Sequence, residues 1–105
     1  MTDSTRYVWR RLVVRDPELS DSTRRVLLEL ESYTEPDGTN AHPGIHRLTA
    51  ALHTKNGPLN ERTIRRALDT GLRRGYIECT RKGHIGRRRN SADTYRLTFP
   101  PETWT

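Results

Sequence analysis

The 105-residue sequence contains few apolar residues, one cysteine and no long hydrophobic run. Hydrophobic residues make up 31% of the chain and charged residues 30%, so we expect one small domain with a thin core. The lone cysteine, Cys79, excludes an intramolecular disulfide and is typical of a reducing compartment. No apolar run approaches the roughly 18 residues of a membrane span, and residues 1–11 lack the features of a secretory signal. We therefore expect a cytoplasmic protein with no membrane partner.

Motifs of the common enzyme classes are also missing. The sequence has no phosphate-binding glycine loop, no nucleophile elbow and no paired carboxylates with a partner histidine. Four scattered histidines and one cysteine do not make a zinc pattern, and no further ligand accompanies His42 and His46. We therefore expect no enzymatic activity, no metal or other cofactor and no small-molecule ligand.

Positive charge is in excess and is unevenly distributed. The formal net charge is +6, residues 1–58 hold eight basic and eight acidic residues, and residues 59–105 hold eleven basic and five acidic ones. Seventeen of the nineteen basic residues are arginine, which codon usage in a GC-rich genome would explain. Codon usage does not explain why one half carries the whole excess. This asymmetry indicates a polyanionic partner, with nucleic acid as the first candidate.

Hydrophobic periodicity predicts two helices in the first third of the chain. The first spans residues 4–15 and ends before Pro17, because the residue preceding a proline avoids helical geometry. The second spans residues 21–34, between an N-cap cluster at residues 20–22 and a turn at residues 36–38. Its expected buried face consists of Val26, Leu27, Leu30 and Tyr33.

Two further helices are predicted in the middle of the chain. One spans residues 43–53 and begins with a proline, which suits a first helical turn; residues 54–58 are predicted to be a loop. The other spans residues 61–74, between an Asn60 N-cap and a Gly75 stop. The expected buried faces consist of Ile45, Leu48, Ala51 and Leu52 in the first, and Ile64, Ala67, Leu68 and Leu72 in the second.

The last third of the chain predicts a β-hairpin with a basic connection. Residues 76–81 and 94–99 are rich in β-branched and aromatic side chains and are expected to pair, and residues 39–42 are expected to form a short extended segment. The predicted fold class is mainly α with a small β-hairpin (α+β). Its architecture is a winged helix-turn-helix: a three-helix core, a wing and an extra N-terminal helix.

In this arrangement the helix over residues 61–74 would enter the major groove of DNA, and the wing would contact the backbone or the minor groove. Arginine is a bidentate donor to guanine and also binds phosphates. Thr63 could reach a thymine methyl group or a phosphate, and Asn60 with the first helical N–H groups could bind a phosphate. The predicted DNA-binding residues are Asn60, Arg62, Thr63, Arg65, Arg66, Arg73, Arg81, Lys82, His84, Arg87, Arg88 and Arg89.

The stretch from Asn60 to Leu68, together with Leu72 and residues 75–77 and 94–97, resembles the winged helix-turn-helix family. This family includes phage and plasmid replication proteins and small actinobacterial regulators. The resemblance covers about residues 20–98 and implies DNA contacts from Asn60, Arg62, Thr63, Arg65 and Arg66. One departure is the loop over residues 53–59, which is longer than the usual tight turn, so the angle between the helices that it joins is not predicted.

We therefore expect a nucleoid-associated bacterial, phage or plasmid protein that binds double-stranded DNA sequence-specifically as a repressor-like transcriptional regulator. A replication or excision factor would use the same surface, and a protein-interaction module is the alternative from another class. The expected domains are an N-terminal extension (1–19), the DNA-binding domain (20–99) and a short tail (100–105). Apolar residues in segment 4–15 predict a homodimer that depends on Trp9 and Leu12.

Overall fold

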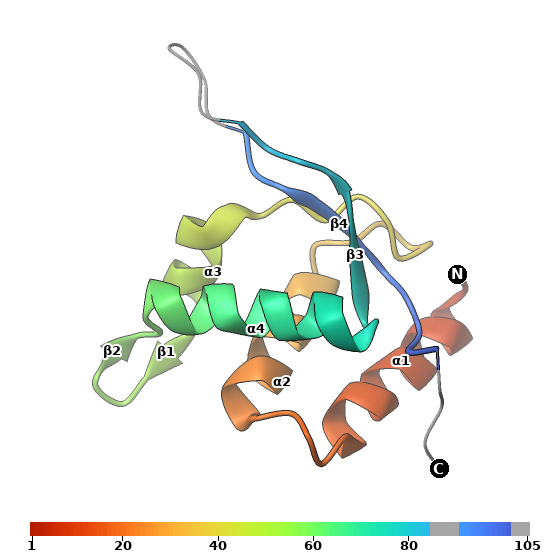
Figure 1. Cartoon of the computed structure of the whole chain (residues 1–105), viewed down its shortest axis with the longest axis horizontal. Helices are drawn as coiled ribbons and strands as arrows, with labels where there is room; N and C mark the ends of the chain where they lie inside the picture. Colours follow the sequence, from red (N-terminus) through yellow and green to blue (C-terminus); the bar gives the residue numbers. More distant parts are fainter. Residues whose placement is uncertain (85–90, 102–105) are drawn as a thin grey trace.

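The computed structural model is a mixed α+β structure whose helices and last hairpin follow the order that the sequence predicts (Figure 1). It describes residues 1–84 and 91–101, and within these ranges it has four helices and two antiparallel hairpins. The elements are α1 (Asp3–Arg15), α2 (Asp21–Glu31), α3 (Gly44–Ala51), β1 (His53–Thr54), β2 (Gly57–Pro58), α4 (Glu61–Arg74), β3 (Ile77–Arg81) and β4 (Thr94–Leu97). None of the helices in these ranges combines the length and apolar character needed to cross a membrane.

Helices α2 and α4 form the centre of the core. Their most buried apolar side chains are Val26, Leu27, Leu30, Ile64, Ala67 and Leu68. Gly71 allows the two helices to approach closely, because a Cβ atom at this position would lie 2.7 Å from Leu27 Cδ2. The absence of a side chain at Gly71 therefore contributes to the position of α4 against α2.

The ends of α4 are as predicted. The Asn60 side-chain oxygen accepts hydrogen bonds from the backbone N–H groups of Arg62 (2.8 Å) and Thr63 (3.3 Å). Gly75 ends the helix with a left-handed φ of 85°, a conformation that costs glycine little. Local chemistry thus sets the start and the end of this helix.

Helix α1 belongs to the same core as the other helices. Trp9 and Val13 are fully buried, and the Trp9 indole N–H donates to the backbone oxygen of Tyr76 (2.9 Å). The two aromatic rings meet edge to face with centroids 6.4 Å apart. Trp9 is therefore inaccessible to a second subunit in this structure. The apolar residues that α1 leaves exposed, called here the α1 outer face, are Tyr7, Val8 and Val14.

A buried carboxylate joins the end of α1 to the end of α4. Asp16 is fully buried, and its Oδ2 atom accepts from Arg74 Nη2 (2.7 Å) and from the Tyr76 hydroxyl (2.7 Å). Oδ1 accepts from the Glu18 backbone N–H (2.9 Å). Burial by itself would raise the pKa of Asp16, but the hydrogen bonds from Tyr76, Glu18 and Arg74 outweigh it, so the pKa is lowered.

A second buried carboxylate, Glu31, joins α1 to the end of α2. It pairs with both Arg6 and Arg10, the latter through Nε at 2.6 Å. Burial would raise the pKa of Glu31, but hydrogen bonds from the two guanidinium groups lower it. Both carboxylates are therefore held charged, and each fastens α1 to the rest of the fold.

Strands β3 and β4 form the wing, defined here as these strands and the residues that connect them. The register pairs Ile77 with Leu97 and Cys79 with Tyr95, and a β-bulge follows Cys79. Ala41 makes an antiparallel bridge to Tyr95. The extended segment predicted over residues 39–42 is thus present only at Ala41, because Asn40 has a left-handed φ of 64°. The strands are shorter than predicted, because β3 begins at Ile77 rather than at residue 76 and β4 ends at Leu97 rather than at residue 99.

Several predicted boundaries and burials are wrong. Helix α2 ends at Glu31 because the next three residues donate their N–H groups three residues back, a tighter turn than an α-helix. Residues 53–58 form a β-hairpin rather than a loop, and α3 ends at Ala51. Leu72 is 39% exposed and Ala51 is also exposed, while Tyr33 is half-buried. Leu72 and Ala51 lie at the margins of their apolar stripes, where neighbouring elements do not cover them.

Candidate nucleic-acid interface

The face of α4 turned away from α2 carries the predicted arginines. Arg62, Arg65, Arg66 and Arg73 are exposed, and Thr63 is half-buried. Ile64, Ala67, Leu68 and Gly71 are buried on the other side of the helix. Helical periodicity thus separates a packed face from a cationic face. The sequence predicts the exposure of the arginines correctly and the packed face correctly except for Leu72.

Two of the arginines on this face are paired with acidic residues of the same helix. Arg65 donates to Glu61 (2.8 Å) and Arg73 to Asp69 (2.9 Å), each at a spacing of four residues. The hydrogen bond from Arg65 also lowers the pKa of Glu61. These pairs are predictable from the i,i+4 spacing, and they distinguish Arg65 and Arg73 from the other two arginines of this face.

The other two arginines, Arg62 and Arg66, have no partner among the described residues. Within the part of the chain that the structure describes, neither guanidinium group makes a hydrogen bond or an ion pair. They are four residues apart and both line a shallow depression on the helix surface. Their charges are therefore available to an external anion.

Asn60 has a structural function in addition to its predicted contact. Its side-chain oxygen already accepts from the backbone N–H groups of Arg62 and Thr63. These two N–H groups are among those predicted to bind a phosphate, and the Asn60 side chain already occupies them. The first turn of α4 also carries the Glu61 carboxylate, so the helix start is less suited to an anion than the sequence indicates.

The outer end of the described part of the wing carries the remaining predicted residues that the structure describes. Arg81, Lys82 and His84 are all exposed. Lys82 Nζ lies 3.5 Å from Asp93 Oδ2. The other oxygen of this carboxylate, Oδ1, accepts from the Gly83 backbone N–H (2.7 Å). The predicted contacts Arg87, Arg88 and Arg89 lie outside the described residues.

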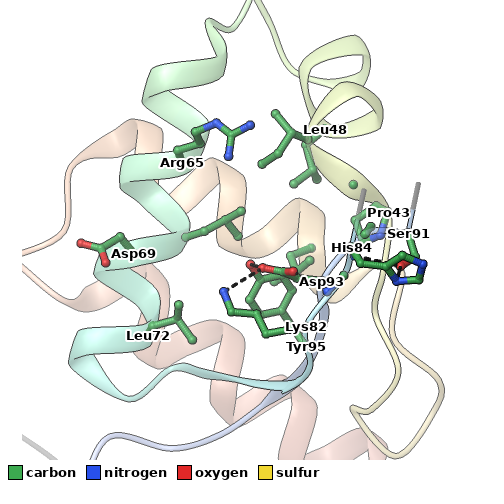
Figure 2. Close-up of a pocket in the computed structure, with 16 residues that line it drawn as sticks. Pro43, Leu48, Arg65, Asp69, Leu72, Lys82, His84, Ser91, Asp93 and Tyr95 are labelled. Carbon is green, nitrogen blue, oxygen red and sulfur yellow. Dashed lines mark hydrogen bonds and ion pairs between the residues drawn. The ribbon is translucent and has the colours of Figure 1, made fainter. Parts of the chain in front are cut away.

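A groove of about 610 Å³ lies between α4 and the outer end of the described part of the wing (Figure 2). Its apolar lining comes from Leu30, Ile45, Leu48, Leu68, Leu72 and Tyr95. Arg65 stands on the α4 wall and Lys82 on the wing wall. The groove was not predicted, because residues from α2, α3, α4 and the wing form it together.

Tyr95 anchors the wing at the floor of this groove. It pairs with Cys79 across the hairpin and with Ala41 on its other side. Burial and the nearby Asp93 carboxylate raise the pKa of Tyr95 to about 12. Strand β4 is thus bound to the segment before α3 as well as to its partner strand β3.

Charge follows the order of the elements. Residues 1–37, which include α1 and α2, hold six basic and eight acidic residues; residues 38–60, with α3 and the β1–β2 hairpin, hold two basic residues and no acidic one. Residues 61–105, with α4 and the wing, hold eleven basic and five acidic residues. The net charge is therefore −2 in the first segment and +8 in the other two combined, and those two supply α3, the hairpin, α4 and the wing.

Comparisons of the chain with family models, with curated proteins and with solved structures found no match. The chemistry of the chain's own surface therefore carries the functional conclusion.

Proposed function

We propose that this protein binds double-stranded DNA sequence-specifically and acts as a transcriptional regulator, with α4 in the major groove and the wing on the backbone or in the minor groove. The observation that carries the proposal is the pair of exposed, unpaired arginines on α4, Arg62 and Arg66. Guanidinium groups without an internal partner can donate to guanine O6 and N7 or to phosphate oxygens without first breaking an ion pair.

The spacing of these arginines supports base recognition. Four residues along a helix correspond to about 6 Å, which is close to two steps of 3.4 Å along a DNA strand. Arg62 and Arg66 would therefore contact positions about two base pairs apart. Arg65 and Arg73, which are held by carboxylates, would contribute less free charge.

The groove beside α4 supports a path for the DNA backbone. A strand that borders the major groove would pass between the recognition helix and the wing. Arg65 and Lys82 stand on opposite walls of the groove, so both could approach the phosphates of that strand. The Asp69 and Asp93 carboxylates also line the groove and would oppose this approach. The apolar floor would face deoxyribose rather than a phosphate.

Selection from a random duplex library, followed by binding measurements, tests the proposal. The protein should enrich a defined site and bind it with a log–log salt slope of magnitude about 0.9 per phosphate neutralised. Arg66→Ala should weaken binding to that site by about 1–3 kcal/mol and affect random DNA much less. Arg62→Ala should relax the base preference at a position about two base pairs from the one that Arg66→Ala affects.

Arg15→Ala is the matched control, because it removes the same charge from an exposed position on α1. It should change neither the affinity nor the preferred site. A salt slope near zero, or equal losses from Arg66→Ala and Arg15→Ala, would contradict DNA binding by α4. Enrichment of no defined site despite salt-dependent binding would contradict the regulatory function and favour an architectural one.

A further inference from the structure

The β1–β2 hairpin, residues 53–58, is a hydrogen-bonded element between α3 and α4. Its strands pair His53 with Pro58 and Thr54 with Gly57. The Thr54 hydroxyl donates to the Gly57 backbone oxygen (2.9 Å) and accepts from the Asn56 backbone N–H (3.1 Å). Gly57 has a φ of 120°, which favours glycine. Lys55 is thereby held at a tight turn.

The hairpin is fixed to the body of the protein at its base. The Leu59 backbone N–H donates to the Leu52 backbone oxygen (2.6 Å), and both leucine side chains are buried in the core. Arg25, on α2, donates to the backbone oxygen of His53 (3.0 Å). These contacts oppose a hinge motion of the hairpin relative to α4.

The hairpin also has a defined position and charge. It lies beside the N-terminal end of α4, on the side away from the wing (Figure 1). Its exposed side chains are His53, Thr54, Lys55, Asn56 and Pro58, and no acidic residue occurs between Asp37 and Glu61. Lys55 makes no side-chain hydrogen bond or ion pair with any residue that the structure describes.

We propose that this hairpin is a second, smaller wing, which binds the DNA backbone through Lys55 on the side of α4 opposite to the β3–β4 wing. The inference rests on the proposed DNA binding. With α4 in the major groove, an element on each side of the helix faces one of the two strands that border the groove. A lysine at a rigid turn supplies a point charge to a phosphate, and it adds affinity without reading the base sequence.

The first test is the substitution Lys55→Ala, measured by titration of fluorescent duplex DNA. Lys55 is exposed and makes no side-chain hydrogen bond or ion pair with the described residues. The variant should therefore keep its fold, which circular dichroism and thermal unfolding can check. Binding should weaken several-fold, by the same factor on the selected site and on random duplex, and the salt slope should fall by about 0.9. The Arg15→Ala variant should match the wild-type protein in both measurements.

The second test locates the hairpin on the DNA. An iron chelate is attached at Lys55→Cys in a Cys79→Ser background, and a second sample carries the chelate at Lys82→Cys. The two samples should cleave the backbone on opposite sides of the selected site. Lys55→Cys cleavage that coincides with that from the wing, or that is absent, would overturn the inference.

The outcomes distinguish this inference from the function on which it rests. If the wild-type protein binds no duplex DNA, the proposed function fails and the second wing fails with it. If the wild-type protein binds DNA and Lys55→Ala binds with an unchanged affinity and salt slope, the second wing alone is wrong.

Discussion

The buried Asp16 carboxylate offers the sharpest test of how α1 is held to the domain, and Asp16→Asn is the change to make. The replacement keeps the size of the side chain and one oxygen that can accept from the Tyr76 hydroxyl. It removes the charge that Arg74 contacts and turns an amide NH2 toward the Glu18 backbone N–H, which then loses its acceptor. Breaking a buried ion pair costs about 3–5 kcal/mol. Arg74 is 34% exposed, so water can compensate part of its lost pairing. We therefore expect a loss of about 2 kcal/mol at neutral pH.

Urea unfolding at a series of pH values measures this loss. With a urea m-value of about 1–2 kcal/mol/M, the transition midpoint should fall by about 1–2 M at neutral pH. Because the fold lowers the pKa of Asp16, its stabilisation is complete above the unfolded pKa of about 3.9 and is lost as the pH falls through the folded value. The wild-type and variant curves should therefore converge in acid.

Glu35→Gln is the control for the same chemical change at an exposed carboxylate, and it should alter stability by less than about 0.5 kcal/mol. An Asp16→Asn variant as stable as this control at neutral pH would refute the anchoring function of Asp16. A difference between the wild-type protein and the variant that persists unchanged in acid would refute the assignment to its charge.

Three further predictions concern the core and the surface. A Trp104→Phe variant keeps Trp9 as its one tryptophan. The fluorescence of Trp9 should have a short emission wavelength and resist quenching by acrylamide until the protein unfolds. The emission of an exposed indole would contradict the burial of Trp9. Leu72→Ala should cost less than about 1 kcal/mol, whereas Leu68→Ala in the same helix should cost about 2–5 kcal/mol; equal losses in thermal unfolding would contradict the observed difference in exposure. We expect the full chain to sediment as a homodimer. A variant in which the three residues of the α1 outer face are changed to serine should sediment as a monomer. A wild-type protein that sediments as a monomer would disprove the dimer.

The structure changes how the dimer should be tested. Deleting residues 1–15 would remove Trp9 and Val13 from the core, so an altered sedimentation of that fragment would report misfolding as readily as lost association. Substitutions on the α1 outer face avoid this difficulty, because its side chains are about half exposed. The sequence predicted an apolar α1 correctly but could not separate the residues that fold inward from those that remain outside.

The parts of the fold that follow from neighbouring residues were predictable. The Asn60 cap and the Gly75 stop act within a few residues of the ends of α4, so their chemistry can be recognised in the sequence. Periodicity likewise placed the arginines of α4 on one face. The i,i+4 pairs of Arg65 and Arg73 were within reach of the same reasoning.

Features that join distant residues were not predictable in this way. Asp16 and Arg74 are 58 residues apart, and no local pattern indicates that they meet. The β1–β2 hairpin has strands of two residues each, too short for an alternating pattern, although Asn56-Gly57 is a turn signal. The groove beside α4 depends on how four elements pack, which the sequence does not state.

The two internal pairs on α4 bear on what kind of DNA-binding protein this surface suits. A uniformly cationic helix would hold any duplex strongly, because phosphate contacts carry no sequence information. Glu61 and Asp69 neutralise two of the four arginines on this face and also repel phosphates, while Arg62 and Arg66 pair with none of the residues that the structure describes. Such a pattern lowers affinity for random DNA and concentrates the remaining donors at two positions. It therefore favours a protein that reads a site over one that coats DNA.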